Sequence, residues 1–340
     1  MKIRYLGSNN TNIEAVDRRR GFGAISHLEG IEVVGDMSFD LVFVGAGGDL
    51  ARALELKRSK PGAGLIFDYA NHYLEEESRL KAFLRPLLHS AFRGYAAYFR
   101  GYKSLILELM SVADQVVCSS RYQQIYLKTL GIEATVITDI FDWEFDFPYQ
   151  IEEKPAHQFI WEGKAFNLDA LLKLEKVVNN FPDIPLAVLT DKKFGGYGAT
   201  QTLGKSVEEE LKTRFQNAAY VPWTTSVLME ELARSTLGLL PINVNSSIGK
   251  AKPENRLILL WRFGVPALTS PLPSYKELAD RTGVDFVCTD EQAWIERIKT
   301  FTEASDQNLA QARFLKDYAD AHYSVAVILD KWRCVLAAVG

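Results

Sequence analysis

The chain has 340 residues, of which 47% are hydrophobic and 24% are charged, so it can bury a large core. A chain of this length predicts two domains. Its formal charge of -4 argues against a dedicated nucleic-acid-binding protein, because affinity for a polyanion depends mainly on clustered cations. Any basic site must therefore be local.

The first half of the chain alternates short apolar runs with helical patterns. The apolar runs predict strands at residues 3–6, 31–34, 41–44, 65–67, 115–117 and 135–137. Several are continuous and rich in β-branched residues, as expected for strands buried on both faces of a parallel sheet. Helical patterns lie at residues 49–60, 73–88, 92–112 and 121–130. This alternation is typical of an open, doubly wound α/β domain.

A polar and aromatic segment at residues 138–155 has no clear period and predicts a linker, after which the alternation starts again. Strands are expected at residues 157–161, 186–189, 219–221, 237–240, 267–269 and 286–288. Helices are expected at residues 168–179, 207–216, 226–235, 254–263, 275–282, 291–300, 304–322 and 325–338. We therefore predict two tandem doubly wound (Rossmann-like) domains, at residues 1–145 and 156–320. Such domains bind ligands at the carboxyl edges of their sheets, here facing a cleft.

The three cysteines, Cys118, Cys288 and Cys334, are far apart and odd in number. They form neither a disulfide framework nor a metal-ligand spacing, which favours a reducing cytoplasm and no metal site. Cys118 and Cys288 end apolar runs, so we expect them to be buried. The first residues enter a strand pattern without a signal-peptide core, and no apolar run is long enough to span a bilayer.

The stretch from Gly249 to Arg256 predicts an anion site. Pro253 suits the first position of a helix, where its missing N–H costs nothing. Lys250, Lys252, Asn255 and Arg256 then gather at the positive end of that helix. Free backbone N–H groups, the helix dipole and cations together favour a bound anion, most often phosphate. The alternative is a solvated basic helix cap.

Other polar residues of the second half follow predicted strands and so lie at the same sheet edge. Gly163 and Lys164 form a second strand-to-helix turn suited to an anion, and Asn167 suits the N-cap of the next helix. A glycine-rich loop at residues 194–204 lies farther along. The remaining candidates for the nucleotide site are Thr190, Asp191, Trp223, Ser246 and Ser247. Trp223 suits stacking on a base, although ordinary packing is the commoner role of a loop tryptophan.

In the first half, Asp68 and His72 stand four residues apart at a strand end and are the candidate catalytic pair. A carboxylate and an imidazole so placed can activate a hydroxyl group. The alternative for Asp68 is a helix cap or a bond to the local backbone. The nearby glycines Gly45, Gly47 and Gly48 do not complete a dinucleotide-binding fingerprint, and tight turns explain them equally well.

The stretch from Arg79 to Lys103 carries six basic residues and no acidic one, with aromatic residues between them. A surface of this kind suits the headgroup region of an anionic membrane. The alternatives are a helix packed in a core with arginines at its rim, and a surface for single-stranded nucleic acid, which the overall charge disfavours.

Three motifs resemble those of GT-B glycosyltransferases, closest to the broad glycosyltransferase family 4 type. They are Ala113–Ser120, Phe159–Lys164, and the run from Asn255 through Gly264-Val265-Pro266 to Ser270. Their order and spacing hold from about residue 113 to residue 278. The resemblance implies GT-B architecture and a nucleotide-diphosphate-sugar donor held by basic residues. It also implies that the last helix, at 321–340, returns to the first domain.

One position departs from that family. Many such enzymes carry two glutamates eight positions apart, and the second, which usually grips the donor ribose, corresponds to Leu259 here. Either Lys252, Asn255 and Arg256 hold the donor in another way, or donor binding has been lost.

The resemblance implies a hexosyltransferase that moves a sugar from a nucleotide donor to a glycan or lipid-linked acceptor. Cell-surface polysaccharide or glycolipid synthesis would suit it, in the cytoplasm or peripherally at the inner membrane face. Cations at Lys164, Lys252 and Arg256 would stabilise the departing diphosphate. Asp68 or His72 would be the base if the reaction inverts configuration. The alternatives are a nucleotide-sugar epimerase and a non-catalytic GT-B partner subunit.

Overall fold

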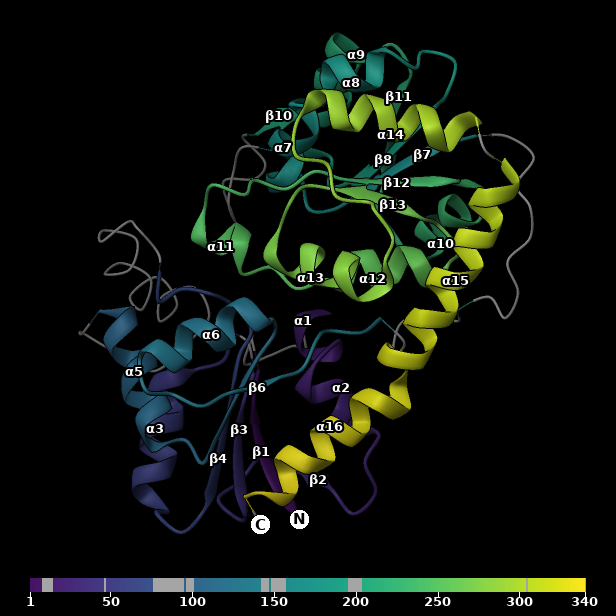
Figure 1. Ribbon diagram of the computed structural model, residues 1–340. Coiled ribbons are helices and arrows are strands. Elements are labelled where there is room, and N and C mark those ends of the chain that lie inside the picture. Colours follow the sequence, from purple (N-terminus) through teal and green to yellow (C-terminus); the bar gives the residue numbers. More distant parts are fainter. Residues whose placement is uncertain are drawn as a thin grey trace. The chain divides into compact units, whose positions relative to one another are not determined.

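The computed structural model describes residues 1–7, 15–45, 47–75, 95, 101–141, 147, 157–194, 204–303 and 305–339. The chain forms two compact units. Unit 1 comprises Met1–Glu144, Ser246–Asn255 and Tyr323–Gly340, and unit 2 comprises Phe145–Asn245 and Arg256–His322. Each unit is built on its own parallel sheet (Figure 1).

The sheet of unit 1 has six parallel strands in the order β2-β1-β3-β4-β5-β6. The strands are β1 (Lys2–Leu6), β2 (Glu32–Val33), β3 (Leu41–Val44), β4 (Gly64–Tyr69), β5 (Gln115–Cys118) and β6 (Thr135–Val136). All four residues of β3 are buried, because helices cover both faces of the sheet. The order reverses between β1 and β3, as in doubly wound folds.

The helices of unit 1 are α1 (Ala15–Arg18), α2 (Gly21–Ser26), α3 (Leu50–Ser59), α5 (Tyr102–Val112), α6 (Arg121–Thr129), α11 (Ser247–Lys250) and α16 (Val325–Ala337). Figure 1 shows α3 and α5 on one face of the sheet and α2 and α16 on the other. The last helix, α16, places the buried Trp332 ring 5.4 Å from the ring of Phe43 on β3. The C-terminal helix is thus part of the core of unit 1.

The sheet of unit 2 has five parallel strands in the order β11-β8-β7-β12-β13. Its strands are β7 (Phe159–Glu162), β8 (Leu186–Thr190), β11 (Ala218–Pro222), β12 (Leu237–Leu240) and β13 (Ala267–Thr269). An antiparallel pair, β9 (Lys193–Phe194) and β10 (Lys205–Ser206), stands apart from this sheet and flanks the predicted glycine-rich loop. Residues 195–203 of that loop lie outside the described part of the chain.

The helical elements of unit 2 are η1 (Ala165–Asn167), α7 (Leu168–Leu172), α8 (Glu175–Asn179), α9 (Val207–Arg214), α10 (Thr225–Arg234), α12 (Asn255–Arg262), α13 (Pro273–Thr282), α14 (Glu291–Glu303) and α15 (Ser305–Tyr323). Figure 1 shows α8 and α14 on one face of the sheet and α12 and α13 on the other. Helix α12 ends at Arg262, and Gly264, two residues later, has a φ of 66°, in the left-handed region. There the N–H of Val265 donates to the carbonyl of Leu260, 2.9 Å away, which closes the helix before β13.

The predicted α/β class with two doubly wound sheets is confirmed, and most strands lie within two residues of their expected bounds. Several local expectations were wrong. Residues 286–288 make only an isolated bridge, at Val287. The helix expected at 168–179 is interrupted between α7 and α8. Helix α12 starts at Asn255, so Pro253 precedes it. The predicted strands and helices also omitted α1, α2, α11, β9 and β10.

The predicted burial of Cys118 and Cys288 is confirmed, whereas Cys334 is exposed. Burial raises the pKa of each of the two buried thiols to about 12, so both stay protonated at neutral pH. Among the described residues, no helix is long and apolar enough to cross a membrane.

Candidate functional site

The sheet of unit 2 has a topological switch point between β7 and β12. From β7 the chain moves to β8 and β11 on one side, and then to β12 and β13 on the other. Connections leave in opposite directions at that point, which opens a crevice at the carboxyl ends of the two strands. Gly163 and Lys164 follow β7 directly, so the sequence places a predicted anion turn at the position where such sheets bind ligands.

The side chain of Arg256, in the first turn of α12, reaches this turn. Its Nε donates to Oε2 of Glu162 at 3.2 Å, and its guanidinium carbon lies 5.6 Å from the ring centroid of Trp161. A Cβ atom built on Gly163 would lie 3.1 Å from Nη2 and 3.3 Å from Cζ of Arg256. The guanidinium therefore packs against the bare backbone of Gly163, an approach that glycine permits because it has no side chain.

A second cation lies at the same turn. Nζ of Lys164 is 3.3 Å from Oδ1 of Asp191, which follows β8, and the backbone N–H of Ala165 donates to Oδ2 at 3.3 Å. The Lys164 side chain is 66% exposed, so it can turn toward a ligand at little cost. The structure thus brings together four predicted residues: Gly163, Lys164, Asp191 and Arg256.

Thr190 and Trp223 lie at the carboxyl ends of the adjacent strands β8 and β11. The N–H of Trp223 donates to the carbonyl of Thr190 at 3.3 Å. Oγ1 of Thr190 and Nε1 of Trp223 are buried and have no hydrogen-bond partner among the described residues. Buried polar atoms usually have partners, so these two atoms are exceptions. Asn167 directly precedes α7 but makes no capping bond with its side chain, contrary to expectation.

The other predicted donor residues, Ser246, Ser247, Lys250, Lys252 and Asn255, belong to unit 1. Side chains hold this segment on unit 1: Ser120 donates to the carbonyl of Ala251 at 2.8 Å, and Ser247 donates to the carbonyl of Glu75 at 3.0 Å. Oγ of Ser246 caps the short helix α11 by accepting from the N–H of Gly249. Lys250 is exposed and Lys252 is partly exposed. The basic stretch is therefore divided, with its last residue, Arg256, in unit 2.

Glu254 and Leu259 show how this chain differs from the paired-glutamate pattern. Oε1 of Glu254 accepts from Thr138 at 3.1 Å and from the hydroxyl of Tyr323 at 3.0 Å, so this carboxylate joins three distant segments of unit 1. Leu259 is 1% exposed, within the apolar face of α12. The position at which the family resemblance expects a ribose-binding glutamate is therefore a core position here.

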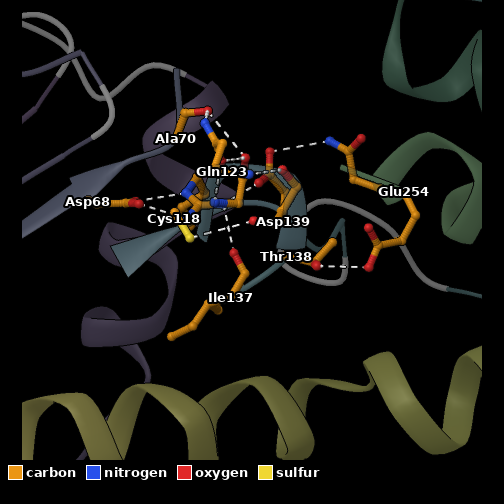
Figure 2. Close-up of polar contacts among 12 residues, drawn as sticks. Asp68, Ala70, Cys118, Gln123, Ile137, Thr138, Asp139 and Glu254 are labelled. Carbon is orange, nitrogen blue, oxygen red and sulfur yellow. Dashed lines mark hydrogen bonds and ion pairs between the residues drawn. The ribbon is translucent and has the colours of Figure 1, made fainter. Parts of the chain in front are cut away.

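Asp68 forms a buried ion pair with Arg20, a residue that precedes α2. Nε and Nη2 of Arg20 donate to the two Asp68 oxygens, each at 2.7 Å, and Nη1 contacts Asp139 and donates to the carbonyl of Ile137 (Figure 2). Asn255 donates to the other oxygen of Asp139 at 3.2 Å. Burial raises the pKa of the Asp68 carboxyl, although Arg20 opposes this shift. The alternative considered for Asp68, a helix cap or a bond to the local backbone, is not what forms: its partner is Arg20.

His72 has a different partner from Asp68. Its Nε2 bonds to Glu75, its ring centroid lies 4.9 Å from that of Tyr126, and its Nδ1 is buried with no partner among the described residues. Burial lowers the pKa of His72, while the bond to Glu75 raises it. The side chains of Asp68 and His72 are each 1% exposed. Neither group reaches the surface in this structure, so their assignment as a base stays a prediction.

Three participants in these contacts were not singled out in the sequence: Arg20, Glu162 and Asp139. Arg20 is the last residue of an arginine run, Arg18-Arg19-Arg20. The sequence does not indicate that only Arg20 of these three is buried. Glu162 stands directly before the Gly163-Lys164 turn. An acidic residue beside a predicted anion site is unusual, and this could have singled out Glu162 in the sequence. Among the described residues, no group of three or more His, Cys, Asp or Glu is placed to hold a metal ion.

The predicted membrane stretch, Arg79 to Lys103, lies almost entirely outside the described residues. Of its aromatic residues, Tyr95 is described and buried, and its hydroxyl donates to the carbonyls of Gly7 and Gly47 at 3.1 and 2.9 Å. Tyr102 is also buried, at the start of α5. These two residues pack inside unit 1.

No protein-family model matches this sequence, and no curated protein is similar to it at the sequence level. Solved structures match it in fold. HepE from Anabaena, in complex with UDP-glucose, superposes with a TM-score of 0.67 at 12% identity, over 99% of this chain and 100% of HepE. A TarM variant from S. aureus, in complex with fondaparinux, α-GlcNAc-glycerol and UDP, gives a TM-score of 0.58 at 12% identity.

The match to TarM covers 87% of this chain but only 55% of TarM, so the chain spans about half the length of that protein. Sucrose-phosphate synthase from Thermosynechococcus elongatus gives a TM-score of 0.58 at 12% identity, over 88% of this chain and 74% of the synthase. The two doubly wound units and these superpositions agree: the chain has the GT-B fold.

Proposed function

We propose that the protein is a glycosyltransferase whose donor is a nucleotide-diphosphate sugar, bound at the switch point of unit 2. The observation that carries the proposal is the contact of Arg256 with Gly163. Two segments separated by more than ninety residues place a guanidinium and a lysine at the turn where doubly wound sheets bind phosphate. HepE, which has the same fold, was solved with UDP-glucose, and this supports a donor of the same class.

The charges at this turn suit the chemistry of glycosyl transfer. When the bond from the sugar to the diphosphate breaks, negative charge grows on the leaving phosphate. Cations fixed at that position stabilise the transition state more than the ground state, which is what accelerates a reaction. Lys164 is a mobile point charge, whereas Arg256 is held by Glu162 and can offer a planar fork to phosphate oxygens.

Calorimetric titration with UDP tests donor binding. We expect UDP to bind the wild-type protein, and Lys164→Ala and Arg256→Ala each to weaken binding by at least about tenfold, since a charge-assisted hydrogen bond contributes roughly 1.5–3 kcal/mol. The chain offers matched controls in unit 2. Lys212 is exposed and ion-paired like Lys164, and Arg262 stands at the other end of α12, paired with Asp320. Lys212→Ala and Arg262→Ala should leave the UDP affinity unchanged.

A turnover assay tests transfer itself. Release of UDP from UDP-glucose only when an acceptor glycan is present would support transfer, whereas conversion of the donor without release would indicate an epimerase. If UDP does not bind, or if the site variants and the control variants bind it equally, the proposed donor site is refuted. The non-catalytic partner role would then stand.

The finer features of the reaction are part of the proposal. A hexose is the proposed sugar, and a glycan or lipid-linked molecule is the proposed acceptor, with a place in cell-surface polysaccharide or glycolipid synthesis. The basic aromatic stretch from Arg79 to Lys103 supports work at the inner membrane face through its composition alone. Co-sedimentation with vesicles containing anionic lipid, compared with neutral vesicles, would test that location.

A further inference from the structure

One acidic residue lies directly beside the proposed donor turn. Glu162 is the last residue of β7, directly before Gly163, and its side chain is 16% exposed. An acidic side chain beside a phosphate site works against anion binding by simple repulsion. A favourable effect on anion binding must therefore offset this repulsion, and the contact of Glu162 with Arg256 can provide it.

The geometry of the contact defines the orientation of the guanidinium. Glu162 accepts at 3.2 Å from Nε of Arg256, the nitrogen that joins the guanidinium carbon to the aliphatic part of the side chain. Trp161 lies 5.6 Å from the guanidinium carbon, and the Gly163 backbone lies close to Nη2 and Cζ. Three consecutive residues of one strand end thus fix the rotation of a long side chain that otherwise has four rotatable bonds.

We propose that Glu162 is a positioning residue, which orients Arg256 so that the guanidinium fork meets the diphosphate of the donor without further rearrangement. This inference rests on the proposed function of the turn. Fixing the side chain in advance lowers the entropy lost when the ligand binds, since an unrestrained arginine loses rotamer freedom at that moment. Glu162 itself touches no substrate and acts only through Arg256.

The comparison of Glu162→Gln with Glu162→Ala tests this role. Both substitutions remove the negative charge, but glutamine retains an oxygen that can accept from Nε of Arg256. We expect the glutamine variant to bind UDP within about threefold of wild type, and the alanine variant to bind about tenfold more weakly than the glutamine variant, in line with the loss of one charge-assisted hydrogen bond. Glu162→Asp, whose shorter side chain cannot reach Nε in the same pose, should resemble alanine.

A double-mutant cycle separates positioning from a general effect on folding. In the Arg256→Ala background the difference between glutamine and alanine at position 162 should vanish, because the group to be positioned is gone. Glu231 offers a matched control: it is a glutamate of α10 with 17% side-chain exposure that accepts from Gln158 at 2.7 Å, before β7. Glu231→Ala should leave UDP affinity unchanged, and circular dichroism should show that every variant is folded.

The proposal is overturned if the alanine and glutamine variants bind UDP equally, or if both bind it more tightly than wild type, which would make Glu162 only a repelling charge. It is also overturned if the difference persists without Arg256. These outcomes differ from failure of the proposed function, in which wild-type protein would not bind UDP at all.

Discussion

Arg20 donates to both carboxylate oxygens of Asp68 at 2.7 Å, and each side chain is only 1% exposed. Two charges removed from water in this way are tolerated because the bidentate geometry satisfies both groups. The pair joins α2 to the end of β4, and the bonds of Arg20 to Ile137 and Asp139 extend it to the segment after β6 (Figure 2). The pair thus connects three segments of unit 1 that are distant in the sequence.

Substitution of Arg20 should be costly. Arg20→Ala leaves the Asp68 carboxylate buried without its cation, and the free energy of unfolding of the protein should fall by about 3–5 kcal/mol. Urea titration followed by intrinsic fluorescence measures this loss. Arg18→Ala, two residues earlier and exposed, should change the free energy of unfolding by less than about 0.5 kcal/mol. Equal effects of the two substitutions would contradict a structural role for the buried pair.

Glu254 should stabilise unit 1 by accepting hydrogen bonds from the hydroxyl groups of Thr138 and Tyr323. Tyr323→Phe removes one hydrogen bond to Oε1 and should lower the free energy of unfolding by about 1 kcal/mol, and Glu254→Ala should cost more, because it leaves the hydroxyls of both Tyr323 and Thr138 without this acceptor. In the Glu254→Ala background, Tyr323→Phe should have little further effect. Additive losses in the double variant would show that the two residues act independently.

The buried His72 should make stability depend on pH. Burial lowers the pKa of His72 in the folded protein, so the unfolded chain binds this proton first as the pH falls. The stability present at pH 7 is therefore lost progressively below about pH 6.5, at up to about 1.4 kcal/mol per pH unit. Urea titrations between pH 7 and pH 5 should show a shallower loss for His72→Gln than for wild type. A His72→Gln variant that keeps the wild-type pH dependence would contradict the prediction.

Gly163 should be sensitive to a single methyl group. In Gly163→Ala the added carbon would lie 3.1 Å from Nη2 of Arg256 and 3.3 Å from the Trp161 ring, so the guanidinium must move by a few tenths of an ångström. We expect UDP affinity to fall several-fold, roughly 1 kcal/mol, while the free energy of unfolding changes less. Calorimetry and urea titration together separate the two effects. Gly62→Ala, where the added carbon meets nothing within 4 Å, is the matched control and should alter neither quantity.

The architecture could be predicted from the sequence, because alternating apolar strands and amphipathic helices permit few arrangements. Continuous runs such as Leu41–Val44 and Leu237–Leu240 were located to the residue, since a strand buried on both faces has an unbroken apolar sequence. The same local chemistry identified the Gly163-Lys164 turn. It could not locate the start of α12, because Pro253 suits both the first turn of a helix and the extended chain before it.

The partners of the charged residues could not be predicted from the sequence. Asp68 and His72 are four residues apart in sequence, yet their partners are Arg20 and Glu75. The basic stretch appeared continuous, yet Lys252 lies in unit 1 and Arg256 in unit 2, where it packs on Gly163. Periodicity records which face of an element is apolar, but an ion pair depends on the distance between atoms that chain folding brings together. A local sequence pattern does not contain that distance. The contact of Glu162 with Arg256 is therefore found only in the folded structure.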